Sequence, residues 1–111
     1  MIKSEGTLTH SISERRMTIR LSGEIDHHSA LSMRAAADEL IYRHRPLSLA
    51  IDLSGIEFMD SSGLGFIMGR YALLKKLGGK IVLLDPNERV EKIISLAGLE
   101  RIISIERTEK K

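Results

Sequence analysis

Hydrophobic and polar positions follow two different periods along the chain. Residues 17–22 and 47–53 alternate apolar and polar side chains, which is the pattern of a half-buried β-strand. Residues 8–13 predict a weaker strand, joined to the next one by a hairpin turn at Glu14-Arg15-Arg16. Two short apolar runs predict further strands at 80–84 and 102–105.

Between these strands the apolar positions recur every three to four residues, which predicts helices. The first helix is expected over 29–42, supported by Leu31, Ala35 and 37–41. A second carries the stripe Leu64, Ile67, Met68, Tyr71 and Leu74 and is ended by Gly78-Gly79. A third carries the stripe Val90, Ile93, Ile94 and Ala97, after Pro86 and before Gly98.

The predicted order of elements is therefore β-β-α-β-α-β-α-β. Strands that alternate with single helices indicate an α/β fold with a mostly parallel sheet and right-handed crossovers. The antiparallel hairpin at the start makes the sheet mixed. Alternation in the second and third strands leaves one sheet face lightly covered, so we expect the helices mainly on the other face. At 111 residues the chain is expected to form a single domain over 1–111.

Composition and charge add several exclusions. The chain has no Cys, which excludes disulfides, thiolate zinc sites and a Cys nucleophile. No apolar run approaches the roughly 18 residues of a membrane span, so we expect a cytoplasmic protein without membrane contact. The net charge is +2 and the pI about 9.1, but the basic residues form short scattered pairs such as Arg15-Arg16 and Lys75-Lys76. We interpret them as solvated charge and expect no direct binding of nucleic acid.

Two strand-to-helix junctions do not resemble plain scaffold. The first is Gly23-Glu24-Ile25-Asp26-His27-His28, and the second is Phe58-Met59-Asp60-Ser61-Ser62-Gly63-Leu64-Gly65. Both follow strands of a parallel sheet, so both are expected at its carboxyl edge, where ligands and partners commonly bind. We therefore expect the two junctions to form one surface.

The second junction carries more polar and small residues than a helix start needs. One of Ser61 and Ser62, preferably Ser62, is expected to cap the second helix, which leaves the other hydroxyl accessible to a kinase. A phosphate would suit a helix N-terminus and would change recognition rather than the fold. Gly63 and Gly65 indicate either tight packing on the sheet or close approach of a partner's backbone. Of Phe58 and Met59, both expected in a turn, one should be core and the other surface.

Other chemistry at these junctions is not supported by the spacing. His27 and His28 are adjacent and therefore point in different directions, so with Asp26 and Asp60 they predict no metal site. A serine hydrolase would need the G-x-S-x-G elbow, which is missing. No phosphate-binding glycine loop is present either. We expect no catalytic residue and no cofactor, and we interpret Asp26 as the cap of the first helix.

The same two segments carry a family resemblance, extended by Gly69-Arg70-Tyr71 and by the Gly78-Gly79 and Gly98-Leu99 positions. They resemble the anti-sigma factor antagonists of the STAS domain family over nearly the whole chain. The D-S-S-G-L-G turn is typical of the antagonists that are phosphorylated. The D-H-H and G-R-Y segments resemble the sporulation branch, which acts on sigma F, rather than the general-stress branch. A basic pI and the short run of 106–111 after the last strand depart from the family.

This resemblance implies a partner-switching cycle. The unmodified antagonist would bind an anti-sigma factor that is a serine kinase and so free the sigma factor. The kinase, which holds the ADP or ATP, would phosphorylate Ser61 and end the binding, and a serine phosphatase would reverse this. The partner-binding residues implied are, in chain order, Asp26, His27, Asp60, Ser61, Ser62, Gly63 and Leu64. Three alternatives remain: a sigma-B-type antagonist with a different kinase, a transporter regulatory domain, and a small serine hydrolase.

Overall fold

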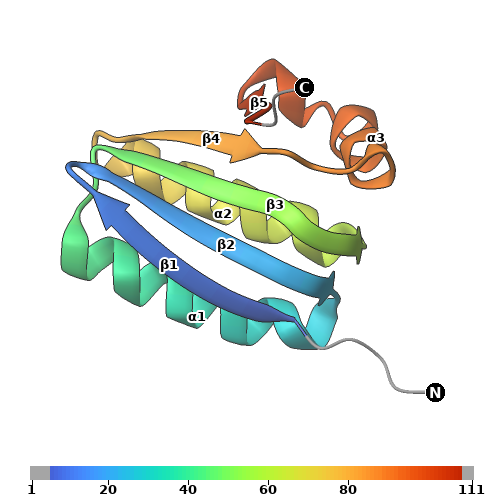
Figure 1. Cartoon of the computed structure of the whole chain (residues 1–111), viewed down its shortest axis with the longest axis horizontal. Helices are drawn as coiled ribbons and strands as arrows, with labels where there is room; N and C mark the ends of the chain where they lie inside the picture. The colour runs from blue at the N-terminus through green and yellow to red at the C-terminus, as the bar shows by residue number, and fades with distance from the viewer. Residues whose placement is uncertain (1–5, 109–111) are drawn as a thin grey trace.

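In a computed structural model that describes residues 6–108, five strands lie side by side in chain order (Figure 1). β1 and β2 form an antiparallel hairpin, and each later strand pairs in parallel with the one before it. The strands are β1 (Thr7–Ser13), β2 (Arg16–Ile25), β3 (Ser48–Met59), β4 (Lys80–Leu84) and β5 (Ser104–Glu106). The mixed, mostly parallel sheet expected from the sequence is therefore confirmed.

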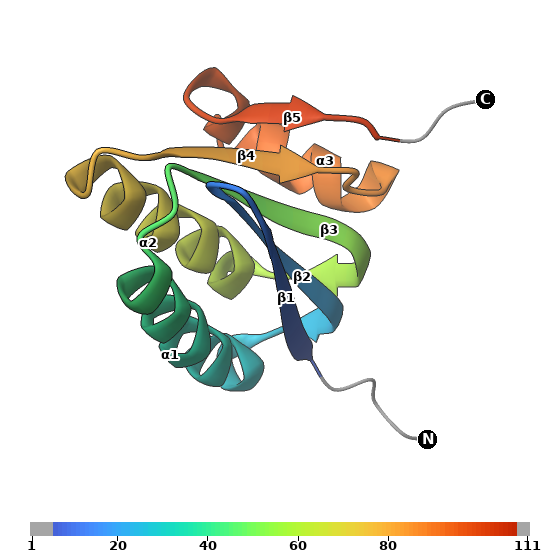
Figure 2. The ribbon, with the colours of Figure 1, turned by 60° about the vertical axis from the view of Figure 1, so that its left-hand side comes forward.

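Three helices and a short 3-10 turn connect the parallel strands. They are α1 (His27–His44), α2 (Ser61–Lys76), α3 (Glu88–Leu96) and η1 (Leu99–Arg101). Buried side chains of all three helices join one hydrophobic cluster, so the helices lie on one face of the sheet, as predicted (Figure 2). The opposite face carries polar side chains such as Thr18, Arg20 and Ser54, and a small apolar group formed by Ala50, Val82 and Leu84.

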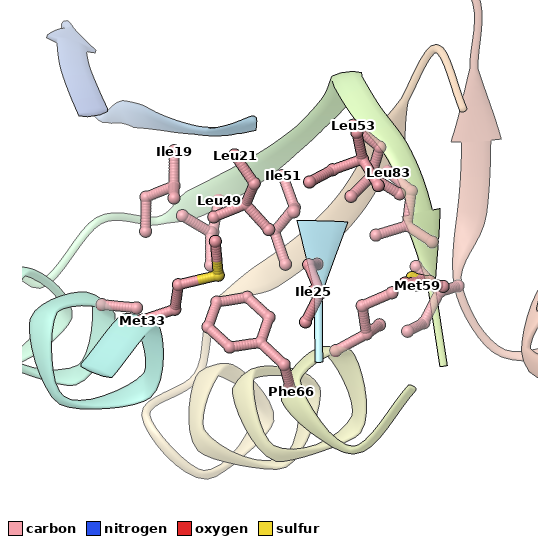
Figure 3. Close-up of a cluster of buried hydrophobic side chains, with 14 of the residues drawn as sticks. Ile19, Leu21, Ile25, Met33, Leu49, Ile51, Leu53, Met59, Phe66 and Leu83 are labelled. Atoms are coloured by element: carbon pink, nitrogen blue, oxygen red, sulfur yellow. The ribbon is translucent and has the colours of Figure 1, made fainter. Parts of the chain in front are cut away.

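The core is aliphatic and lies between the sheet and α1 and α2 (Figure 3). Along residues 17–21 of β2 and 49–53 of β3 every second residue points into it, and these residues, which include Ile19, Leu21 and Ile51, are fully buried. Met33 of α1 and Phe66 of α2 fill the space beneath them. Burying such side chains contributes roughly 1.5–3 kcal/mol each before the entropy of ordering is subtracted.

The strand β3 is longer than its hydrophobic alternation indicates. Its register against β2 shifts twice, between Arg20 and Ser22 and between Gly23 and Glu24. Each shift inserts one extra residue into β3, so the buried positions become Leu53, Ile56 and Met59, three residues apart. Such bulges bend a strand and increase its twist, and they are frequent beside functional sites.

The element order matches the prediction, but several boundaries differ. The second and third strands extend to Ile25 and Met59, beyond the predicted ends at 22 and 53. The first helix spans 27–44 instead of 29–42, and the last strand is 104–106, because 99–101 form the 3-10 turn. Positions 1–5 and 109–111 of the expected domain lie outside the described residues. Among residues 6–108, no helix is both long and apolar enough to cross a membrane.

Candidate partner-binding site

The two junctions lie side by side at the carboxyl edge of the sheet. β2 and β3 are neighbouring parallel strands, and both α1 and α2 start at the right-hand end of the sheet in Figure 1. The backbone N–H of Asp60 donates a hydrogen bond to the carbonyl oxygen of Ile25 at 3.2 Å. One hydrogen bond therefore joins the residue before α2 to the last residue of β2, and the two junctions lie side by side on one surface, as the sequence predicted.

Asp26 caps α1, as expected. Its Oδ1 accepts a hydrogen bond from the backbone N–H of Ser29 at 2.9 Å. In return the Ser29 hydroxyl oxygen accepts one from the backbone N–H of Asp26 at 3.0 Å, so the pair forms a reciprocal capping box. The Ser29 hydroxyl also donates to the carbonyl oxygen of Glu24 at 3.1 Å, which ties the first turn of α1 back to the end of β2.

The expectation that Ser62 or Ser61 caps α2 is wrong. The cap is Asp60, whose Oδ1 accepts a hydrogen bond from the backbone N–H of Ser62 at 2.7 Å. Aspartate and serine are similarly good caps, and the extended backbone at Asp60 puts the carboxylate in the capping position. Both serines therefore lie inside the first turn of α2.

Ser61 is the first residue of α2 and its side chain is exposed, whereas Ser62 is half-buried. No hydrogen bond of the Ser61 hydroxyl is found among residues 6–108, so the group is available to an incoming reagent. Backbone N–H groups at a helix N-terminus favour negative charge. A phosphate on Ser61 would therefore lie at a favourable end of α2 while it changed the charge of the surface.

Apolar side chains lie beside the serine. Phe58 is 41% exposed and Met59 is fully buried, which confirms that one is surface and the other core, although both lie in β3 rather than in a turn. Leu64 is half-buried and packs against the core cluster, and Met68, one turn further along α2, is 39% exposed. The hydroxyl of Ser61 therefore lies on a surface that contains both carboxylates and exposed apolar groups.

The two glycines of the D-S-S-G-L-G turn have different surroundings. Gly63 is buried, and a Cβ at this position would lie 2.8 Å from Cβ of Met59, so its absence permits close packing of α2 on β3. A Cβ at Gly65 would meet nothing within 4 Å, and the residue is exposed. Packing thus explains Gly63, and its predicted partner contact stays a prediction. For Gly65 the structure shows no packing reason, and the expected close approach of a partner stays a prediction.

This contrast predicts opposite effects of alanine at the two glycines. Gly65→Ala should stabilise the fold by about 0.5–1 kcal/mol, because glycine is a poor helix former and the new methyl group has room. Gly63→Ala should destabilise it by about 1–3 kcal/mol, because the methyl group must displace Met59. Urea unfolding of the two variants measures both values. Equal effects of the two substitutions would contradict the assigned packing role of Gly63.

The histidines and carboxylates do not assemble a metal or catalytic site. Among residues 6–108 there is no group of three or more side chains that could hold a metal ion. His27 and His28 are both exposed at the start of α1, and no hydrogen bond within that range joins either to Ser61. Within residues 6–108, Ser61 is therefore not hydrogen-bonded to a base, as the nucleophile of a serine hydrolase would be.

A buried ion pair between α1 and α2 was not predicted from the sequence. Arg70 is only 5% exposed, and its Nε lies 2.9 Å from Oδ1 of Asp38, in a direction too poorly aligned for a hydrogen bond. Its Nη1 donates to the carbonyl oxygen of Phe66 at 3.2 Å. Burial lowers the pKa of Arg70 below its usual value, Asp38 opposes this shift, and Arg34 adds to it. The pair links the side of α2 to the side of α1.

Two known proteins have sequences similar to this chain. The anti-sigma F factor antagonist of Paenibacillus polymyxa is 40% identical over 89 residues, which cover 80% of this chain and 76% of that protein. The anti-sigma-B factor antagonist of Bacillus subtilis is 33% identical over 93 residues, 84% of either chain.

Solved structures show the same fold. The anti-sigma factor antagonist SpoIIAA in its unphosphorylated form has a TM-score of 0.81 and 28% identity, covering 94% of this chain and 90% of that chain. The phosphorylated form of Bacillus SpoIIAA has a TM-score of 0.74 and 28% identity, covering 94% and 93%. The family model of the STAS domain matches residues 7–111. The chain therefore belongs to the STAS domain family, with close relatives named anti-sigma F factor antagonists.

Proposed function

We propose that this chain is an anti-sigma factor antagonist that is switched by phosphorylation of Ser61. The observation that carries the proposal is the exposed hydroxyl of Ser61 at the first position of α2, on the surface shared with Asp26. Phosphorylated and unphosphorylated structures exist for a relative with the same fold. Antagonists of this kind are regulatory binding proteins and not enzymes. In this proposal Ser61 accepts a phosphate from the kinase and does not act as the catalytic nucleophile of a hydrolase.

The switch follows from the charge of the site. Before modification the surface offers the carboxylates of Asp26 and Asp60, a small serine side chain and the exposed ring of Phe58 to a partner. A phosphate adds about 1.5–2 negative charges and three acceptor oxygens where the partner must approach closely. The α2 N-terminus tolerates that charge, so the fold is kept while the complementary surface is lost.

The proposed partners are an anti-sigma factor that is a serine kinase, holding ADP or ATP itself, and a serine phosphatase that removes the phosphate. We assign the sporulation type, acting on sigma F, because the P. polymyxa relative shares 40% identity against 33% for the sigma-B-type relative. A pull-down against both kinds of kinase separates the two. A screen with ester substrates tests the remaining alternative, a serine hydrolase.

Incubation with the kinase and ATP tests the proposal directly. We expect the intact mass to rise by one phosphate, and fragment ions to place it on Ser61, because Ser61 is exposed and Ser62 is half-buried with its N–H bound to Asp60. Ser61→Ala should remain unmodified, whereas Ser62→Ala should still be phosphorylated. A phosphate on Ser62 would overturn the assignment.

Asp26 is expected to contact the kinase through its charge. Asp26→Asn should keep the cap on α1, because asparagine caps about as well as aspartate, so the melting temperature should barely change. Affinity for the kinase with ADP should fall by roughly 1–3 kcal/mol, the range for a hydrogen bond to a charged group. Calorimetry of both variants measures this, with Glu39→Gln on the exposed part of α1 as control for net charge. Equal affinities would reduce Asp26 to a helix cap.

A further inference from the structure

The strand β1 forms one outer edge of the sheet within the described part of the chain. It pairs with β2 along its whole length, Thr7 to Ser13, and within residues 6–108 no segment pairs with its other edge (Figure 1). Natural edge strands usually carry a lysine, a proline, a bulge or a very short length, because unpaired backbone groups invite another strand. The seven residues of β1, Thr-Leu-Thr-His-Ser-Ile-Ser, contain neither charge nor proline, and the register with β2 has no bulge.

The sequence of β1 is also complementary to itself. When two copies pair antiparallel about His10, Leu8 lies opposite Ile12, Thr9 opposite Ser11, and Thr7 opposite Ser13. Apolar side chains therefore meet apolar ones, and hydroxyls meet hydroxyls, which are favourable cross-strand pairs. A shift of the register by one residue would bring Leu8 and Ile12 opposite polar side chains.

Each kind of side chain also lies on one face of the sheet. The Thr7 hydroxyl lies 3.0 Å from that of Ser22 on the polar face, so Thr9, Ser11 and Ser13 share this face. The helical face of β1 carries Leu8, which packs on the core, and Ile12, which is 43% exposed. A second copy would cover Ile12 by placing its own Leu8 beside it.

We propose that two copies of this chain pair through β1, antiparallel about His10, and form one continuous ten-stranded sheet, five strands from each copy. The two-fold axis is perpendicular to the sheet, so the helices of both copies lie on the same face. Ala36 and Leu40 lie on the flank of α1 opposite Asp38, which faces α2, and each half-buried flank would pack against its copy.

This pairing is independent of the proposed function. The strands of the two copies run in opposite directions. The carboxyl edges of the two sheets, which carry Asp26 and Ser61, therefore lie at opposite ends of the assembly. Partner binding and self-association therefore use different surfaces, and each experiment can fail without the other.

Single cysteines test the pairing, because the chain has none of its own. In the proposed register the two copies of residue 10 face each other with Cα atoms about 4.5–5.5 Å apart, within the range of a disulfide. His10→Cys should therefore oxidise to a covalent dimer much faster than Glu39→Cys, an exposed control on α1. Equal rates for the two variants would overturn the proposal, provided that circular dichroism shows both to be folded.

The register has its own test. Thr9→Cys alone should cross-link slowly, since like residues are offset by two positions, whereas a mixture of Thr9→Cys with Ser11→Cys should give the heterodimer rapidly. Fast cross-linking of Thr9→Cys alone would refute a pairing centred on His10.

A charge at the axis tests the same contact without a thiol. His10→Lys places like charges opposite each other and should weaken association in sedimentation equilibrium by roughly two- to five-fold, while the uncharged His10→Thr should preserve it. Sedimentation of the unmodified chain as a monomer at every concentration, or identical association of the two variants, would contradict the proposal.

Discussion

Ser61→Ala is expected to bind the anti-sigma kinase permanently and so keep the sigma factor released. Removing one exposed hydroxyl takes away the acceptor without altering a contact of the fold, because the Ser61 hydroxyl makes no hydrogen bond within residues 6–108. Transcription from a sigma-dependent promoter, reconstituted with kinase and ATP, should then continue where it stops with the unmodified chain. The Ser62→Ala variant serves as control and should still be switched off.

Ser61→Asp and Ser61→Glu should have the opposite effect and bind the kinase poorly. A carboxylate at the first position of α2 suits the helix N-terminus, so both variants should unfold at nearly the same temperature as the parent. The loss should therefore appear in the binding isotherm and not in the melting curve. Acidic variants that bind as tightly as the parent would show that charge alone does not operate the switch.

Most of the fold could be predicted from periodicity, and its failures have local causes. Alternation gave the second strand only to residue 22 and the third only to 53 because the register shifts at the β2–β3 pair interrupt the period of two. The true end of β3 buries Ile56 and Met59, three residues apart, which is not the period of two that indicates a strand. The bulges that confuse the pattern also bring Asp60 beside Ile25, so the error fell at the candidate site.

The local chemistry of the site could be located but not fully assigned. Asp26 was correctly expected as a cap because aspartate is a frequent cap residue, although the helix begins at 27 and not at the expected 29. At the second junction Asp60, Ser61 and Ser62 are all suitable caps, and only the backbone conformation decides among them. Exposure then separates Ser61 from Ser62, a distinction that sequence cannot make.

Helix faces were the least predictable feature. The expected stripe of α1 included Leu31, which is 55% exposed, and it missed Met33, which is buried; of the expected residues, Ala37 and Ile41 are buried. On α2, Met68 was expected on the apolar stripe and is surface, and Arg70 occupies the core side instead. Hydropathy cannot place an arginine there, because its burial depends on a partner from another helix.

Asp38, the partner of Arg70, is expected to have the second large effect when it is substituted. Asp38→Ala is expected to destabilise the fold by about 3 kcal/mol, because Arg70 would stay buried without its counter-charge. The value lies at the low end for a buried pair, since the Asp38 side chain is 32% exposed and water can partly replace it. Urea unfolding measures the loss, and Glu39→Ala, at an exposed ion pair one position along α1, should change stability by less than about 1 kcal/mol.

The loss of stability in Asp38→Ala can come from leaving Arg70 charged without a partner, or from losing a net favourable ion pair. The double variant Asp38→Leu with Arg70→Met distinguishes these two causes. Removing both charges also removes the desolvation that lowers the Arg70 pKa, so the double variant should recover most of the stability lost in Asp38→Ala. If the pair contributes only to the stability of the fold, the double variant should bind the kinase as tightly as the parent. If instead the fixed geometry between α1 and α2 sets the distance from Asp26 to Ser61, the stable double variant should still bind the kinase more weakly than the parent. Unfolding curves for the single and double variants that coincide would show that Arg70 is not held by Asp38 in solution.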